Sequence, residues 1–574
     1  MVSYIGLGGL IVLFSLGAVD WWQGRTSDDV ESGPTLAVLP FENLSNDSST
    51  EPFVRGIHDD LLTALSRTRS LKVVSRTSVM GYQGTTKTLP QIAEELGASV
   101  ILEGGIQRSG NRIRMNVQLI DTRTAEQLWA ERFDRTLTAE NVFAIQGEIA
   151  ERISDALRTA LTAEEKSRLG HLPTANLHAL DLYYQGIDFY SNRIENMDAR
   201  SAELAFARAT DADPSFAAAW AGLAQARSWL IRWGMETDTT SARQALDRAV
   251  ALAPGERETA LAQGVYYYYA KGDFQTSADH FESALRSWPE DAELLNYRSL
   301  VLRRLGRWEE ALDGQELAHQ IDPRNPSILI DLAETLQFLR RYEEAELYFD
   351  QVLALLTPPE TGRIRARKFE LLLLGRGDTL SARRLLEAWI DPVNKLAYAS
   401  YAARLAFFER DYSAGVAALE STLAERSFPV LAPFQLAILW RWAGQEETSL
   451  AWSDSLYFAA DMMIEQFRSS QVDPFGSEAE LTSYRGLAHA LSGRFVEAVR
   501  DGRRGTEMLP YVKDAVEANE VLDNLATIYI LVGNRDAALA VVDTLVSRPS
   551  VQVGAGRLRL DPTYDTLRGD PRFD

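Results

Sequence analysis

Side chains that could carry out chemistry are few in this 574-residue chain, and their spacing builds no recognisable catalytic site. Cysteine is absent, which excludes disulfides, thiolate metal sites and cysteine nucleophiles. The histidines show no paired spacing of the kind that holds a metal ion; they stand at positions 58, 171, 178, 280, 319 and 489. No Gly-x-Ser-x-Gly nucleophile elbow occurs either. The sequence therefore predicts no metal, no cofactor and no enzymatic activity.

Three short stretches come nearest to a chemical site. Residues 81–88 carry the glycines and lysine of a phosphate loop but lack the Gly-Lys-Ser/Thr join, so we interpret them as a polar loop. His58 and Asp59 could form an acid–base pair, and we interpret them instead as the polar first turn of a helix. Residues 266–269 are four tyrosines that could stack on a ligand. On a helix these four point all round, so at least half of them must pack between helices.

The amino end predicts a membrane anchor. Residues 1–19 hold no charged side chain and, as a helix, would span about 28 Å, enough for a bilayer core. Trp21 and Trp22 follow, where a membrane interface favours amphipathic rings. We therefore assign residues 1–22 to a transmembrane anchor and 23–34 to a polar linker. Two alternatives remain, a cleaved signal peptide that lacks the usual basic start, and a buried helix of a soluble protein.

Residues 35–161 alternate between strand and helix signals. Residues 36–41 read as a buried strand and 71–75 as a second one, with an amphipathic helix between them. Residues 112–119 place Ile, Met, Val and Leu on one face and Arg, Asn and Gln on the other, which is typical of a half-buried strand. A strongly amphipathic helix closes the region at Leu161. The predicted order is βαβαβββα, a small α/β domain.

Several blocks in this region, taken in order, resemble the TolB-like (FlgO-like) amino-terminal domain of bacterial signalling proteins. They are residues 36–45, 74–78, 92–97, 119–121 with 128–134, and 143–150. Members of that family often carry a winged-helix, protein kinase or nucleotide cyclase domain ahead of a membrane helix. Only the apolar segment precedes the linker here, so we expect the usual output module to be missing. The resemblance implies a body in the periplasm, held at the bacterial inner membrane by one anchor.

From Leu177 onward a period of 34–35 residues takes over. Prolines recur at positions 254, 289, 323, 358 and 392, and Gly272-Asp-Phe, Gly306-Arg-Trp and Arg340-Arg-Tyr repeat 34 residues apart. This pattern resembles the tetratricopeptide repeat, in which paired helices stack because no single pair can bury its apolar face. We assign residues 162–176 to a linker, 177–549 to an α-solenoid of nine or ten repeats, and 550–574 to a carboxyl-terminal cap.

The repeat register predicts a partner groove lined by the first helix of each pair. Its candidate residues are Tyr266, Tyr269, Asn296, Arg303, Glu334 and Gln337. The predicted function is a membrane-anchored scaffold or sensor module that binds a partner polypeptide segment. The alternative is the regulatory remnant of a signalling enzyme or transcription regulator. An envelope assembly factor follows only by analogy with the FlgO-like family.

Charge narrows the choice of partner. The chain carries 59 Lys and Arg against 81 Asp and Glu, a net charge of −22. Residues 35–161 contribute −2, whereas residues 162–574 hold 44 basic and 61 acidic side chains and contribute −17. Such a surface disfavours the phosphate backbone of nucleic acids and favours basic or mixed-charge protein partners.

Overall fold

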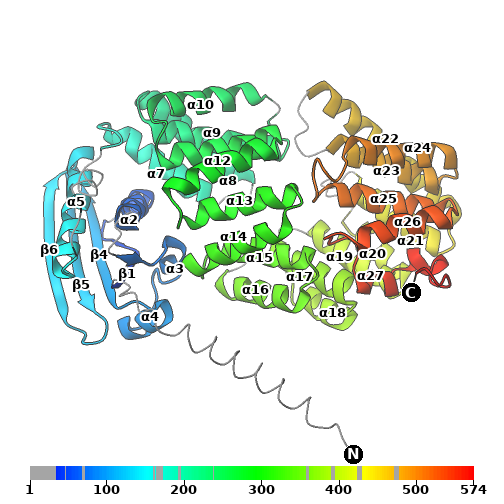
Figure 1. Ribbon diagram of the computed structural model, residues 1–574, viewed down its shortest axis with the longest axis horizontal. Helices are drawn as coiled ribbons and strands as arrows, with labels where there is room; N and C mark the ends of the chain where they lie inside the picture. Colours follow the sequence, from blue (N-terminus) through cyan, green and yellow to red (C-terminus); the bar gives the residue numbers. More distant parts are fainter. Residues whose placement is uncertain are drawn as a thin grey trace, which may run out of the picture. The chain divides into compact units, whose positions relative to one another are not determined.

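The structure is a computed structural model that describes most of the chain in two compact units, residues 1–171 and 172–574 (Figure 1). The described residues are 34–45, 47–66, 71–159, 162, 172–191, 196–236, 238–356, 361–389, 395–422, 430–470 and 477–573. The predicted anchor 1–22 and nearly all of the predicted linker lie outside them. Within the described part of the chain, no helix is both long enough and apolar enough to cross a membrane.

The first unit is a mixed β-sheet with helices. Its elements are β1 (Thr35–Val38), β2 (Glu42–Asn43), η1 (Ser48–Thr50), α2 (Glu51–Ser66), β3 (Lys72–Val73), α3 (Arg76–Met80), α4 (Leu89–Leu96), β4 (Val100–Ser109), β5 (Arg112–Asp121), β6 (Gln127–Thr136) and α5 (Ala139–Ala156). The strands lie in the order β3-β1-β4-β5-β6, and β2 pairs with β4. β1 pairs in parallel with β3 and β4, and β2 pairs in parallel with β4, whereas β5 is antiparallel to both β4 and β6.

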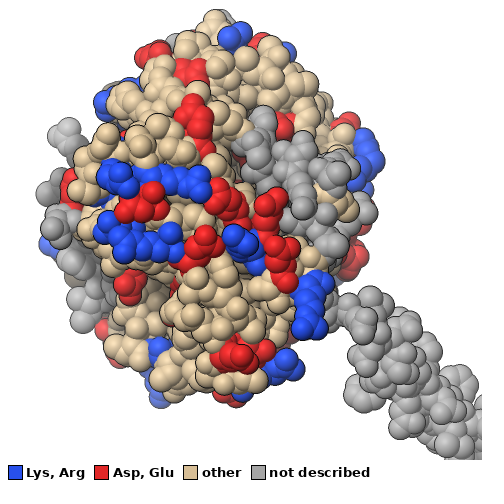
Figure 2. All heavy atoms as spheres, turned by 90° about the vertical axis from the view of Figure 1, so that its left-hand side faces the viewer, with Lys and Arg blue, Asp and Glu red and all other residues tan. Residues whose placement is uncertain are grey.

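The alternation in β5 is confirmed. Ile113, Met115, Val117 and Leu119 are at most 3% exposed and form the buried face of the strand. On the opposite face, cross-strand pairing brings Asp134 beside arginines of β5 and β6: it lies 2.9 Å from Arg114 Nη2 and 3.7 Å from Arg132 Nη2. Viewed from the side of β6, Figure 2 shows Lys and Arg side chains in rows with Asp and Glu between them.

Two details of this unit correct the predicted order. The predicted strand 36–41 ends early, because the chain leaves β1 at Val38, and a separate strand, β2, follows at residues 42–43 and pairs with Gly105 and Ile106 of β4. A short helix, α3, follows β3, where Ser75 accepts a hydrogen bond from the Ser78 amide and caps the helix. Elements this short carry no hydrophobic period, so the pattern could not reveal them.

His58 is not in a first turn. The helix α2 begins at Glu51, so His58 lies in its middle, 1% exposed. Its Nε2 is 3.0 Å from the Val38 carbonyl oxygen, and its ring meets the Phe41 ring edge-on. These contacts connect α2 to the end of β1, which makes His58 a structural residue of the core.

The second unit consists of stacked antiparallel helix pairs, ten of them within the described residues. They are α7 (Leu177–Ser191) with α8 (Asn196–Ala212), α9 (Ala217–Arg232) with α10 (Thr239–Leu252), α11 (Arg257–Val265) and η2 (Tyr266–Lys271) with α12 (Phe274–Ser287), α13 (Ala292–Arg304) with α14 (Trp308–Ile321), α15 (Pro326–Phe338) with α16 (Tyr342–Leu355), α17 (Gly362–Glu370) and η3 (Leu371–Arg376) with α18 (Thr379–Glu387), α19 (Lys395–Phe408) with α20 (Tyr412–Glu420), α21 (Leu431–Trp442) with α22 (Glu446–Ser470), α23 (Ser477–Leu491) with α24 (Phe495–Met508), and α25 (Ala518–Leu531) with α26 (Arg535–Val546). α27 (Ala555–Leu560) and η4 (Pro562–Thr566) follow.

Small residues set how closely the paired helices approach. A Cβ atom added at Gly264 would lie 2.3 Å from Phe281 Cζ, and one at Gly186 would lie 2.6 Å from Phe206 Cδ1. Both phenylalanines are fully buried. The ring of the second helix therefore occupies the space left by the missing side chain of the first.

The end of the solenoid returns to its middle, since α27 packs against η3, and Figure 1 shows α27 beside α20. We call this the closing contact. It comprises Arg304 with Asp514, Trp308 Nε1 with the Tyr511 hydroxyl, the Ser550 amide with the Phe338 carbonyl, Arg340 with the Leu545 and Val553 carbonyls, Arg559 with the Arg376 carbonyl, and Arg410 with Asp565. The partners are 155 to 213 residues apart in the sequence.

The closing contact explains an unusual backbone at two turns. Between paired helices the turn residue takes a positive φ, and glycine fills this place at Gly306 (φ 73°). Arg340 (φ 60°) and Arg410 (φ 63°) adopt the same conformation with a side chain. Both guanidinium groups reach the returning carboxyl-terminal segment. The cost of a left-handed arginine, about 1 kcal/mol, is offset by these contacts.

Candidate functional site

The first helices of successive repeats form a continuous inner layer, joined by polar side chains. Asn296 Nδ2 on α13 donates to the Asp331 carboxylate on α15 at 2.7 Å. Arg303 Nη1 on α13 donates to Thr335 Oγ1 on α15 at 3.2 Å. Arg367 Nε on α17 lies 3.1 Å from Glu334 Oε1. Each contact therefore links one repeat to the next along this inner layer.

Five of the six predicted groove residues fall in two groups, and the sixth, Gln337, lies on α15. Asn296, Arg303 and Glu334 come together around Asp331, with Arg303 Nη1 3.7 Å from Glu334 Oε2. Tyr266 and Tyr269 lie in η2 of a neighbouring repeat, among other aromatic rings. Five of the six are nearly closed to solvent, with exposed fractions of 3% (Tyr266), 7% (Asn296), 8% (Arg303), 9% (Glu334) and 2% (Gln337), whereas Tyr269 is half-buried.

Glu334 is an ionised carboxylate held among guanidinium groups. Burial opposes its ionisation, but the charges of Arg367, Arg363 and Arg303 lower the pKa of Glu334 from 4.5 to about 2. At Asp331 the balance is reversed: burial outweighs the charge of Arg303, and the pKa of Asp331 is raised above its ordinary value. The group is built as an internal ion-pair network, which fixes the relative placement of three repeats.

Several charged residues of the inner layer were not anticipated from the sequence. Arg367 and Glu370 lie on α17, one repeat beyond Glu334. Glu480 lies on α23, Glu520 on α25, and Glu517 directly before α25. Their side chains are partly open to solvent; Glu370 is 16% exposed and Glu517 is 27% exposed. A 34-residue step from Glu334 leads to position 368, so the repeat alignment did not select Arg367 or Glu370. The degenerate stretch 396–475 interrupts the repeat register before α23, so the alignment could not be extended to Glu480, Glu517 and Glu520.

Acidic groups crowd around Glu520. The charge of Glu480, followed by burial and the charges of Glu517, Asp523 and Glu370, raises the pKa of Glu520 well above its ordinary value. Burial is the main reason that the pKa of Tyr484 is raised well above its ordinary value, and the charges of Glu520 and Glu480 raise it further. Carboxylates from three helices thus converge on one part of the inner layer, and a positive charge placed there would relieve their mutual repulsion.

The chemistry available to this layer is recognition by charge and hydrogen bonding. Within the described ranges, no group of three or more His, Asp or Glu side chains could hold a metal ion. His280 and His319 lie on second helices of repeats, and burial lowers the pKa of each. The stacked helix pairs and their small-residue contacts define this part of the chain as a tetratricopeptide-repeat solenoid.

Family comparisons agree with the repeats and assign the first unit differently. Residues 261–326 and 328–363 match the tetratricopeptide repeat, which confirms that part of the resemblance. Residues 32–152 match the family described as HilA/YgeH-like transcriptional regulator, second domain. The family model that matches this region is therefore the HilA/YgeH-like one, and the resemblance to the TolB-like domain stays a prediction.

One curated relative and two solved structures are also similar. The relative, named putative adenylate cyclase 3 of Rhizobium meliloti (strain 1021), is 40% identical over 192 residues, which are 33% of this chain and 32% of the relative. The chain thus spans about a third of the length of the curated relative that it matches.

Both solved structures are distant. A tetratricopeptide repeat protein from Parabacteroides merdae is 18% identical over 47% of this chain and 98% of its own, with a TM-score of 0.34. TolB from Acinetobacter baumannii is 18% identical over 22% and 28%, with a TM-score of 0.17. Since neither likeness is close, the repeat assignment rests on the family matches and the observed helix pairs.

Proposed function

We propose that this chain is a membrane-anchored interaction scaffold whose repeats bind a basic segment of a partner protein along the inner layer. Tetratricopeptide repeats support a protein-interaction role. The observation that carries the finer proposal is the convergence of Glu480 and Glu520, whose mutual repulsion a lysine or arginine of a partner would relieve. Glu370 lies in the same part of the layer and is paired with Arg367 and Arg404. The buried network around Glu334 would then support the layer and leave the binding to these partly exposed carboxylates.

The anchor and the compartment belong to the same proposal. The apolar residues 1–19 and the two tryptophans after them support a single anchor in the bacterial inner membrane, and the TolB-like resemblance supports a periplasmic body. Protease added to intact spheroplasts should then degrade the body of the chain. Complete protection of the body would overturn the periplasmic placement and leave the binding proposal to its own test.

The binding proposal is tested by crosslinking from the inner layer. A photoreactive residue replaces Arg363, which is 60% exposed on α17, and for comparison Arg286, which is exposed on the second helix α12. Position 363 should capture a partner through a Lys- or Arg-rich segment, and position 286 should not. A synthetic peptide of that segment should lose about tenfold in affinity for E480Q/E520Q and none for E497Q/E507Q. Equal crosslinking at both positions, or equal affinity in both double variants, would exclude this binding layer.

A second candidate function rests on the sequence relative. The 40% identity to a putative adenylate cyclase over 192 residues supports a regulatory part of a cyclase-like signalling system whose catalytic part is encoded separately. Purified full chain should then form no cyclic AMP from ATP alone, and it should alter the rate of a cyclase encoded nearby. An in-frame cyclase, kinase or winged-helix sequence upstream of the present first codon would favour this candidate over a stand-alone scaffold.

A further inference from the structure

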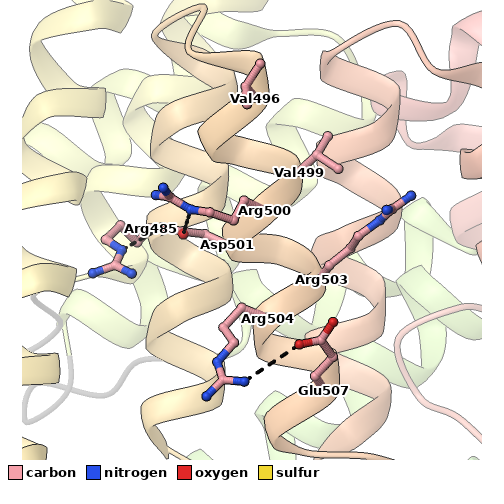
Figure 3. A pocket seen from close by; sticks show the side chains of 8 residues that line it. All are labelled: Arg485, Val496, Val499, Arg500, Asp501, Arg503, Arg504 and Glu507. Carbon is pink, nitrogen blue, oxygen red and sulfur yellow. Dashed lines mark hydrogen bonds and ion pairs between the residues drawn. The ribbon is translucent and has the colours of Figure 1, made fainter.

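The outer face of the second helix α24 differs from the rest of the acidic solenoid because it gathers arginines. Arg500, Arg503 and Arg504 are exposed on α24 and, with Arg485 of α23, line an open hollow of about 620 Å³ (Figure 3). Residues 162–574 as a whole carry a net charge of −17. A local concentration of guanidinium groups therefore stands out against the surrounding charge.

These guanidinium groups outnumber the carboxylates beside them. Asp501, 3% exposed, accepts from both Arg485 Nε at 2.7 Å and Arg500 Nε at 3.1 Å. Arg504 Nη1 lies 3.7 Å from Glu507 Oε2, a long contact between two exposed groups that contributes little. Four arginines thus share two lining carboxylates, although Arg485 also reaches Asp461 on α22.

Arg503 is the arginine best prepared for a ligand. Its Nε donates to the Tyr529 hydroxyl at 2.8 Å, and its guanidinium carbon lies 5.9 Å from the centre of that ring. Tyr529 is 5% exposed and belongs to the core under α24, so the tyrosine orients the guanidinium without neutralising it. Among the described residues, no carboxylate within 4.0 Å pairs with Arg503. Glu507 acts on this guanidinium through its charge but makes no ion pair with it within 4.0 Å. An oriented guanidinium without a direct carboxylate partner suits a carboxylate from outside.

The same face has an exposed apolar end. Val496 is 81% exposed and Phe495 is 46% exposed, one to two turns before the arginines. Residues 496, 500, 503, 504 and 507 recur at helical spacing on one side of α24, as Figure 3 shows. A partner that covered this side would bury the valine and pair with the arginines together.

We propose that this side of α24 is a second docking surface, specific for an acidic polypeptide segment that carries an apolar residue near its carboxylates. Charge complementarity selects this occupant, since the net positive hollow on an acidic solenoid attracts anionic groups and repels basic ones. The partner differs in charge from the basic segment proposed for the inner layer. The scaffold would therefore hold two partners of opposite charge on two faces.

The test uses the full chain and a fluorescein-labelled peptide of alternating Asp and Glu with one Leu. R503Q/R504Q should weaken its binding about tenfold, and V496D should weaken it too. The matched control, R243Q/R248Q, removes the same charge from exposed sites on α10. It should leave the affinity unchanged, and the same peptide made with Asn and Gln should not bind.

Each other result overturns the proposal. Absent binding by the wild-type chain, unchanged affinity in R503Q/R504Q, or equal loss in R243Q/R248Q would show that α24 does not select acidic segments. A single-stranded oligonucleotide that binds through Arg503 while the peptide does not would identify a nucleic-acid surface instead. A concentration-dependent dimer abolished by R503Q/R504Q, without peptide binding, would identify a second copy of the chain as the occupant. None of these outcomes involves Glu480 or Glu520, so the inner-layer proposal stands or fails separately.

Discussion

Arg304 Nη1 lies 3.0 Å from the Asp514 carboxylate, although 210 residues separate the two in the chain. The Asp514 side chain is 1% exposed and that of Arg304 is 11% exposed, so D514A would remove one of the two carboxylates that contact a nearly buried guanidinium, the other being Glu517. We expect D514A to reduce the free energy of unfolding by about 3 kcal/mol, measured by denaturant titration. The control is E310Q, which breaks the exposed pair with Arg307 and should cost under about 0.5 kcal/mol. Equal losses would contradict a buried closing contact.

Glu334 predicts a stability loss at acid pH. Its pKa of about 2 lies below the ordinary 4.5, so its contribution is present above pH 4.5 and is lost as pH falls through about 2. E334Q should cost about 2–3 kcal/mol at pH 7. The difference from wild type should shrink steadily between pH 4.5 and 2. A difference that stays constant over that interval would show that the charge of Glu334 is not the cause.

Glu520 predicts the reverse dependence. Its raised pKa means that its neutral form favours folding, so this contribution is complete below pH 4.5 and is lost as pH rises through the raised value. E520Q, which cannot ionise, should leave Tm unchanged at pH 4 and raise it by about 2 °C at pH 8. E507Q removes an exposed carboxylate from α24 and should show no such trend. A lower Tm for E520Q at pH 8 would contradict the crowding of carboxylates.

The packing of paired helices predicts a contrast between two glycines. G264A would place a Cβ atom 2.3 Å from the Phe281 ring, which has no room to move, so we expect a loss of about 1–3 kcal/mol. G255A meets nothing within 4 Å and should change stability by less than about 0.5 kcal/mol. Thermal unfolding of both variants measures the difference. Comparable changes would show that close approach at Gly264 is unimportant.

Replacing Arg410 by glycine should have two opposite effects on stability, because it relieves backbone strain and removes an ion pair. R410G removes the left-handed strain, worth about 1 kcal/mol, and also removes the pair with Asp565, whose pKa Arg410 lowers. Stability of the repeats should hold or rise slightly, while protease should cut near residues 561–573 faster than in wild type. R410K, which keeps the charge and the strain, should protect the tail better than R410G. Identical cleavage rates in wild type, R410G and R410K would show that Arg410 does not hold residues 561–573 in place.

The sequence predicted the repeated helix pairs, but it did not predict the contacts between helices that are far apart in the chain. Proline and glycine spacing identified the helix pairs at 258–392, because each repeat folds by contacts with its neighbours. The alternating side chains of residues 112–119 identified β5 and its buried face. The closing contact has no such local signal, since Arg304 meets Asp514 only after the superhelix has turned.

The sequence indicated on which helices the candidate groove residues lie, but it did not indicate how deeply they are buried. Alignment placed Arg303 and Glu334 on first helices, where the structure has them. Their burial depends on Arg367 and Asp331 closing over them, and a periodic pattern cannot show how tightly the superhelix winds. The arginines of α24 were present in the sequence as a run of charges, and only the structure shows that they outnumber the carboxylates they face.

The return of residues 511–565 to the middle of the solenoid also bears on how the chain is made. Helix pairs up to α20 can stack as they leave the ribosome, because their contacts are with immediate neighbours. Arg304, Phe338 and Arg340 must wait for partners that are synthesised about two hundred residues later. Until then the growing chain lacks the closing contact, so a partner that arrived during synthesis would meet repeats that this contact does not yet hold.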